Sequence, residues 1–161
     1  AQFDEAKLRW VNAQHLKAMA DDALAPLVAA QLTQRGITAD ERLPAICGLF
    51  KDRCDTTVAL ADWAQAFYAD VQPTPEDLAK HVTDAVKPAI ATLAYKLAGV
   101  EWRADAIAAV IKDTLAAHGL KMPQLAMPVR VLVMGTPQTP SLDAVLALGR
   151  REKVLARLSR A

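Results

Sequence analysis

The sequence predicts an all-α protein, and three of its features support that prediction. Just over half of the 161 residues are hydrophobic, and many of these are alanine, so the chain can bury a core. Alanine, leucine, lysine, arginine, glutamine and glutamate favour helices, whereas aromatic residues and glycines are few. Capping residues and prolines divide the chain into segments of helical length. This combination argues against a β-sandwich or barrel.

In the first half, helices are predicted where a capping side chain precedes apolar residues at helical spacing. Such side chains stand at Asp4, Asp21 or Asp22, Asp40, and Thr56 or Thr57. Gly36 is expected to end the second helix, because glycine suits the left-handed conformation that often follows a helix. The third helix is expected to carry both cysteines, Cys47 and Cys54, as small packed side chains.

The sharpest break in the chain is Gln72-Pro73-Thr74-Pro75. Two prolines end one helix there, and Thr74 with Pro75 begins the next as N-cap and first helical residue. We therefore predict two sub-domains, residues 1–72 and residues 73–161. Pro88 should divide residues 75–98 into two helices, because proline removes a helical hydrogen bond.

A further helix is predicted from about residue 103 to 117, with Gly119 as its stop. In residues 128–134, valine stands at every second position, and this alternation of β-branched residues is typical of a strand. No second strand is evident to pair with the segment. Thr139-Pro140 repeats the signal of a cap followed by proline. Two short helices, at roughly 140–148 and 150–159, are predicted after it.

No catalytic or metal-binding constellation stands out in the sequence. The histidines are scattered, the cysteines lack the close spacing of a zinc site, and no phosphate loop or nucleophile motif is present. We predict no catalytic residue and no metal ligand. Cysteine usage, with no signal peptide or membrane-spanning run, favours a reduced cytoplasmic protein. The first residue is alanine and not methionine, which is consistent with a piece of a longer protein.

Basic side chains gather at the end of the chain. Residues 121–161 contain seven lysines and arginines against two acidic residues, although the whole chain has a net charge of only +1. This asymmetry indicates either an anionic partner on one side or an ordinary solvated helix face at a terminus. Charge alone does not separate the two interpretations.

Three stretches carry a more specific signal. They read Phe-Asp-Glu-Ala-Lys-Leu-Arg-Trp-Val-Asn at 3–12, Lys-Asp-Arg-Cys-Asp-Thr at 51–56, and Met-Pro-Val-Arg-Val-Leu-Val-Met-Gly at 127–135 with Thr-Pro-Ser-Leu at 139–142. Trp102 precedes Arg130 by 28 residues. In this order, and over the whole chain, they resemble the anticodon-binding half of bacterial glutamyl-tRNA synthetases.

The resemblance implies a helical cage of two small sub-domains with no significant sheet, so residues 128–135 should be helical. It also implies that the catalytic domain, which uses ATP and magnesium to attach glutamate, is absent. The chain alone should then be inactive and hold no cofactor. The expected partner is the anticodon loop of tRNA-Glu, bound by a cytoplasmic monomer, with no role for DNA or a membrane.

Arg53 matches the family position that reads the third anticodon base, which is cytosine in glutamate tRNA and guanine in glutamine tRNA. The cytosine edge offers two acceptors, whereas the guanine edge offers two donors. Because an arginine carries donors only, it suits cytosine and opposes guanine. The resemblance thus implies a discriminating enzyme. The alternative is an Arg53 that pairs with Asp52, Asp55 or a helix C-terminus.

The resemblance assigns the other anticodon contacts to the second sub-domain. Arg130 matches a position that contacts the anticodon, and the alternative for it is a buried salt bridge. Thr139, Pro140 and Leu142 match the loop around the middle base, although Thr139-Pro140 also suits helix capping. Lys112 aligns where a basic residue approaches the first base or its phosphate.

Arg151 and Lys153, together with Arg150 and Arg157, are candidates for phosphate contacts. The family has a glycine followed by a basic residue at this turn. Here Gly149 stands one place early and Arg150 takes the glycine position, which leaves the geometry of the turn open.

The leading hypothesis is therefore a tRNA-binding module. A helical protein–protein interaction module that uses the same basic face is the second hypothesis. A stand-alone enzyme is the third, and the missing nucleophile, metal and phosphate motifs argue against it.

Overall fold

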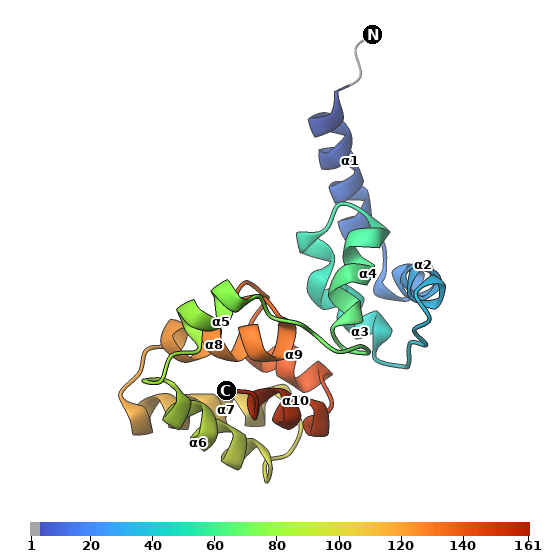
Figure 1. The fold of residues 1–161 in the computed structure, drawn as a ribbon. Coiled ribbons are helices and arrows are strands. Elements are labelled where there is room, and N and C mark those ends of the chain that lie inside the picture. Colours follow the sequence, from blue (N-terminus) through green and yellow to red (C-terminus); the bar gives the residue numbers. More distant parts are fainter. Residues whose placement is uncertain (1–3) are drawn as a thin grey trace. The chain divides into compact units, whose positions relative to one another are not determined.

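The computed structural model describes residues 4–161, and within that range it contains ten α-helices, one short 3-10 helix and no strand (Figure 1). The all-α prediction is confirmed. Phe3, which belongs to the block at 3–12, lies outside the described residues. The chain divides into two compact units, Ala1–Asp70 and Val71–Ala161, and each is described by itself.

The first unit contains α1 (Glu5–Ala18), α2 (Asp21–Gln34), α3 (Leu43–Phe50), the 3-10 helix η1 (Lys51–Arg53) and α4 (Thr57–Gln65). Asp4 and Thr56 cap α1 and α4 as predicted, because their side-chain oxygens accept the amides of Lys7 and Ala59. The predicted cap of α2 is wrong. Its N-cap is Ala20, and both aspartates lie in the first turn, where the positive end of the helix favours negative charge.

The core of the first unit lies between α2, α3 and α4, while α1 projects beyond them (Figure 1). The ring of Phe50 stacks on that of Trp63 at 5.0 Å and meets that of Phe67 edge-on at 5.8 Å. Cys47 and Cys54 are buried and unpaired. Only Cys47 lies in α3, so the prediction that both cysteines share this helix is wrong: α3 ends at Phe50 and Cys54 follows η1.

The second unit contains α5 (Pro75–His81), α6 (Lys87–Leu97), α7 (Ala104–His118), α8 (Met122–Met134), α9 (Leu142–Leu148) and α10 (Arg151–Leu158). Thr74 caps α5 by accepting the amide of Asp77 at 3.1 Å. Pro88 lies in the first turn of α6, as its position predicts. Gly119 ends α7 with a positive φ of 63°, which favours glycine.

Helix α8 includes the segment whose alternation resembles a strand. Residues 128–134 are helical, so the expectation drawn from the family resemblance is confirmed and the strand pattern is misleading. Eight residues of α8 are buried, and the helix packs against α5, α6 and α10. A helix covered on several sides is apolar all round, and its sequence then loses the periodicity that marks a helix with one apolar face.

Candidate nucleic-acid interface

In the first unit, the candidate site lies on the short connection between α3 and α4. Helix α3 passes directly into η1, and Cys54 then turns to an extended conformation before Thr56 caps α4. Phe50 is fully buried and Cys54 is 5% exposed, so the backbone on both sides of Arg53 is anchored in the core. Arg53 itself is exposed.

The guanidinium of Arg53 has no hydrogen bond or ion pair with any other residue in the range 4–161. The expected alternative, a pairing with Asp52, Asp55 or a helix C-terminus, is therefore not what the structure contains. The five guanidinium N–H donors of this exposed side chain therefore have no acceptor within residues 4–161. A rigid backbone with a free donor fork suits the recognition of acceptor-rich groups.

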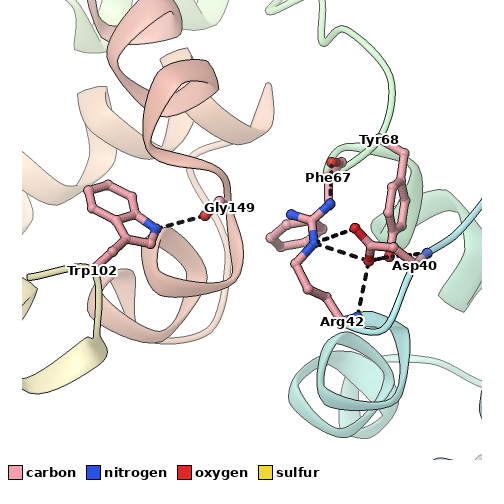
Figure 2. A network of polar contacts seen from close by, with 6 residues as sticks. All are labelled: Asp40, Arg42, Phe67, Tyr68, Trp102 and Gly149. Carbon is pink, nitrogen blue, oxygen red and sulfur yellow. Dashed lines mark hydrogen bonds and ion pairs between the residues drawn. The ribbon is translucent and has the colours of Figure 1, made fainter.

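A polar cluster ties together the two ends of this helical core (Figure 2). The Asp40 carboxylate accepts hydrogen bonds from Arg42 Nε at 2.9 Å, from the Arg42 amide at 3.0 Å and from the Tyr68 hydroxyl at 2.8 Å. The Arg42 guanidinium also lies 5.0 Å from the centre of the Tyr68 ring. These contacts join the segment before α3 to the segment after α4.

The cluster changes the pKa values of its members. Burial acts to raise the pKa of Asp40, but the hydrogen bonds from Tyr68 and Arg42 outweigh it and hold the pKa below its usual 3.8. Burial, followed by the hydrogen bond to Asp40, raises the pKa of Tyr68 to about 12. Asp40 is therefore charged and Tyr68 neutral near pH 7, which is the state that these hydrogen bonds require.

In the second unit, a cavity of about 290 Å³ brings two of the predicted residues together. Arg130 and Leu142 line it, with Ser141 and Asp143 beside them, and Ala108, Ile111 and Met122 complete the wall. Arg130 is half-buried and donates through Nη2 to the carbonyl of Pro140 at 3.4 Å. The guanidinium of α8 is thus tied to the loop that leads into α9.

Thr139 has a different role from the predicted cap. It is 6% exposed, and its hydroxyl donates to the carbonyl of Pro140 at 2.8 Å. Helix α9 begins at Leu142 with Ser141 as its N-cap, so capping by Thr139 is not observed. The Pro140 carbonyl accepts from both Thr139 and Arg130, and this shared acceptor gives the loop its shape.

The basic side chains at the end of the chain mostly bind the backbone of their own unit. Arg151 donates to the carbonyls of Ala98 and Val100 at 2.7 and 2.6 Å. The other guanidinium–carbonyl pairs are Arg157 with Val133 at 2.8 Å, Arg160 with Val71 at 3.3 Å, and Arg130 with Pro140. Four of the seven basic residues that suggested an anionic partner therefore stabilise the fold.

The other three of those seven basic residues are exposed: Lys121 before α8, Arg150 at the start of α10, and Lys153 in its first turn. Lys112 on α7 is exposed as well. Lys112 directly follows Ile111, which lines the cavity beside Arg130.

Gly149 lies in the turn between α9 and α10, where a side chain would be crowded. A Cβ atom at residue 149 would lie 3.0 Å from Cγ2 of Val154, which is buried, so a side chain would crowd the packed first turn of α10. Arg150 is the N-cap of α10 and is exposed. The glycine belongs to the end of α9 and the arginine to the start of α10.

Metal and redox chemistry receive no support from the described part of the chain. Within residues 4–161, no three histidine, cysteine or acidic side chains lie close enough to share a metal ion. Burial is the main cause that raises the pKa of Cys47 and of Cys54 to about 11, so both are neutral thiols near pH 7. None of the helices in this range is long and apolar enough to span a membrane.

The family model described as "Anticodon binding domain" matches residues 13–161, and the chain belongs to this family.

The chain is similar to curated glutamate--tRNA ligases. It is 70% identical over 158 residues to that of Albidiferax ferrireducens, which covers 98% of this chain and 34% of that protein. It is 66% identical over 166 residues to that of Verminephrobacter eiseniae, with 98% and 35% covered. The chain thus spans about one third of the length of these relatives.

The fold is also similar to that of a solved structure. A crystal structure of a glutamate tRNA ligase from Elizabethkingia meningosepticum, in complex with its amino acid, matches with a TM-score of 0.89 at 21% identity. The match covers 99% of this chain and 32% of that one.

Proposed function

We propose that the chain is the anticodon-reading part of a glutamate--tRNA ligase and that it binds the anticodon loop of tRNA-Glu. The family match and the names of the relatives support this proposal. The rest of such a ligase would supply the step that uses ATP and magnesium to attach glutamate. This chain would supply affinity and specificity for the tRNA.

One observation carries the proposal: the guanidinium of Arg53 is exposed, has no partner within residues 4–161, and stands on a backbone anchored by buried neighbours. Single-stranded loop bases are recognised through their Watson–Crick edges and by stacking. A donor-only fork matches the two acceptors of cytosine and meets the donors of guanine unfavourably. Arg53 is thus suited to select the third anticodon base.

The cavity beside Arg130 supports a second contact. Its wall combines the donors of Arg130 with the apolar side chain of Leu142, and the loop around Pro140 is held by two hydrogen bonds. An apolar wall beside fixed donors suits an unstacked base such as uracil. In this proposal the cavity takes the middle base, and Lys112 approaches the first base or its phosphate.

The experiment is a titration of the 161-residue chain with a tRNA-Glu transcript and with the same transcript carrying guanine as the third anticodon base. The unmodified chain should prefer cytosine, and Arg53→Gln should remove about 1–3 kcal/mol of that preference, by analogy with base readout in DNA. Arg9→Gln is the matched control, because Arg9 is an exposed arginine of the same unit. If the unmodified chain bound both transcripts equally, with an affinity that depended only on the salt concentration, anticodon reading would be contradicted.

A further inference from the structure

Contacts between distant segments hold a short connection in place in each unit. In the second unit, the indole Nε1–H of Trp102 donates to the carbonyl of Gly149 at 2.7 Å, which restrains the turn before α10 (Figure 2). In the first unit, a comparable contact is made by Lys51, the first residue of η1. Lys51 lies two residues before Arg53, so a contact that fixes Lys51 also limits the path of the backbone that carries Arg53.

The ammonium group of Lys51 binds the junction between α1 and α2. Its Nζ donates to the carbonyl of Met19, the C-cap of α1, at 2.9 Å. The same nitrogen lies 3.0 Å from Oδ1 of Asp21, in the first turn of α2. Met19 is 32 positions from Lys51 in the sequence, so the contact exists only in the folded unit. Helix α1 also packs against η1.

The side chain of Lys51 is engaged within its own unit. It is only 19% exposed, whereas Arg53 is exposed. A base or phosphate contact by Lys51 would require its contacts with Met19 and Asp21 to break. Because the ion pair is partly buried, salt screens it less than it screens a surface pair. Lys51 is therefore suited to hold the connection, and Arg53 is the side chain that can reach a base.

Gly48 of α3 leaves the space that this ion pair occupies. It lies one helical turn before Lys51, and its φ is not positive, so the position requires space and not an unusual backbone. A Cβ atom at residue 48 would overlap Oδ2 of Asp21 and would lie 2.9 Å from its Cγ. Any side chain there would push the carboxylate away from Lys51. The glycine, the acid and the lysine thus depend on one another.

The backbone after Arg53 is restrained as well. The amide of Cys54 donates to the carbonyl of Lys51 at 3.2 Å, which closes the 3-10 turn around Arg53. The Sγ of Cys54, which is 5% exposed, lies 3.5 Å from the carbonyl of Phe50 as a weak donor. The turn that carries Arg53 is therefore closed on itself, and Lys51 attaches it to the junction between α1 and α2.

We propose that Lys51 is a positioning residue for Arg53. Its contact with Asp21, in the space that Gly48 leaves, fixes the connection so that the guanidinium meets the edge of the third anticodon base. This inference rests on the proposed function and assigns roles to residues that touch no base. An arginine fork discriminates through the alignment of its donors with one acceptor edge. A displaced fork loses the match with cytosine and the conflict with guanine together, so the preference between the two bases falls.

The test is the preference of the 161-residue chain for cytosine over guanine, measured with the same two tRNA-Glu transcripts. Lys51→Met should lower this preference about two- to tenfold, the lower part of the range for coupling within one network. Loss of folded protein would weaken the apparent affinity for both transcripts by the same factor and leave their ratio unchanged. Lys7→Met is the matched control, since Lys7 is an exposed lysine on α1, and it should keep the preference. An unchanged preference in Lys51→Met would overturn the inference.

A double variant tests whether Lys51 acts through Arg53. In the Arg53→Gln variant, the side chain that Lys51 positions is already removed. Adding Lys51→Met to that variant should therefore lower the preference no further. The same loss in both backgrounds would show that Lys51 changes base preference by another route, and would overturn the positioning role.

Gly48→Ala tests the space around the ion pair without removing a charge. Alanine favours a helix more than glycine does, so the helix itself is not weakened. Its Cβ should displace the carboxylate of Asp21, and the preference for cytosine should fall about two- to tenfold. In the Asp21→Ala background no carboxylate is left to displace, so Gly48→Ala should cause no further loss. An unchanged preference in Gly48→Ala, or an equal loss in both backgrounds, would overturn the roles of Gly48 and Asp21.

The same titrations separate failure of this inference from failure of the proposed function. If the unmodified chain shows no preference for cytosine, the proposed function fails and this inference fails with it. If the unmodified chain prefers cytosine and Arg53→Gln removes that preference, while Lys51→Met and Gly48→Ala both keep it, only this inference fails.

Discussion

Arg53 in the first unit differs from two arginines near the end of the second unit in what its guanidinium binds. In the first unit, Arg53 is exposed and its guanidinium has no partner within the described residues. In the second unit, Arg151 and Arg157 donate to main-chain carbonyls, and Arg157 is only 7% exposed. The basic end of the sequence, which suggested an anionic partner, thus has fewer available charges than its composition indicates.

This difference separates recognition from stability. An arginine that donates to a helix-terminal carbonyl satisfies an acceptor that the helix leaves open, and its removal should lower the free energy of unfolding. An exposed arginine without partners contributes little to the fold, and its removal should change only binding. The following variants test this division, in order of decreasing expected effect on stability.

Arg157→Met should have the largest effect. It keeps an apolar stem of similar length but leaves the carbonyl of Val133 without the donor at 2.8 Å. We expect the free energy of unfolding to fall by about 3 kcal/mol, the scale of a buried charged hydrogen bond with its acceptor left unsatisfied. Urea denaturation followed by circular dichroism measures it. Arg160→Met is the control: Arg160 is exposed, so this substitution should lower the free energy of unfolding by less. If Arg157→Met were as stable as the unmodified chain, Arg157 would not stabilise the fold and its contrast with Arg53 would fail.

Asp40→Asn tests the polar cluster of the first unit. It removes the negative charge of the carboxylate that accepts hydrogen bonds from Arg42 and Tyr68. The free energy of unfolding at pH 7 should fall by about 2 kcal/mol, the scale of hydrogen bonds to a charged group. The pKa of Asp40 is lowered in the folded protein. Its stabilisation is therefore complete above the unfolded pKa of 3.8 and is lost as the pH falls through the lower, folded pKa.

The stability difference between Asp40→Asn and the unmodified chain should accordingly shrink as the pH is lowered below about 3.8. Urea titrations at pH 7 and at several acid pH values measure this difference. A difference that stays constant with pH would mean that the charge of Asp40 is not what holds the cluster together.

Thr56→Ala removes the N-cap of α4, close in sequence to Arg53. The hydroxyl oxygen accepts the amide of Ala59 at 3.0 Å, and loss of such a cap costs about 1 kcal/mol. Thr57→Ala, one residue later and inside the helix, is the matched control and should stay within about 0.5 kcal/mol of the unmodified chain. Similar losses in both variants would exclude a specific capping effect.

Arg53→Gln should have the smallest effect on stability, within about 0.5 kcal/mol, because an exposed side chain without partners is removed. The same variant should have a large effect on the preference for cytosine over guanine. A variant that is as stable as the unmodified chain but has lost its base preference would contrast with Arg157→Met, in which stability is lost. A marked loss of stability in Arg53→Gln would show that Arg53 has a structural role after all.

Local signals in the sequence predicted much of the fold. Threonine followed by proline predicted the start of α5, and aspartate predicted the start of α1, because capping depends on neighbours within three residues. Predictions failed where distant contacts decide the outcome. Alternation at residues 128–134 suggested a strand because α8 is buried on several sides.

The site was less accessible to sequence reasoning than the fold. The family resemblance named Arg130 and Leu142, and the structure brings them to one cavity. It named Arg151 as a phosphate contact, yet the acceptors of Arg151 are carbonyls more than 50 residues away in the chain. Backbone carbonyls leave no mark in a sequence, so a structural arginine and a ligand-binding arginine look alike until the fold is known.

The indole of Trp102 also has an optical consequence. The chain has three tryptophans, and Trp10 and Trp63 both belong to the first unit. Trp102 is therefore the single tryptophan of the second unit, and its N–H is hydrogen-bonded to the turn before α10. In a chain that carries phenylalanine at positions 10 and 63, its emission would report the state of that turn without any attached label.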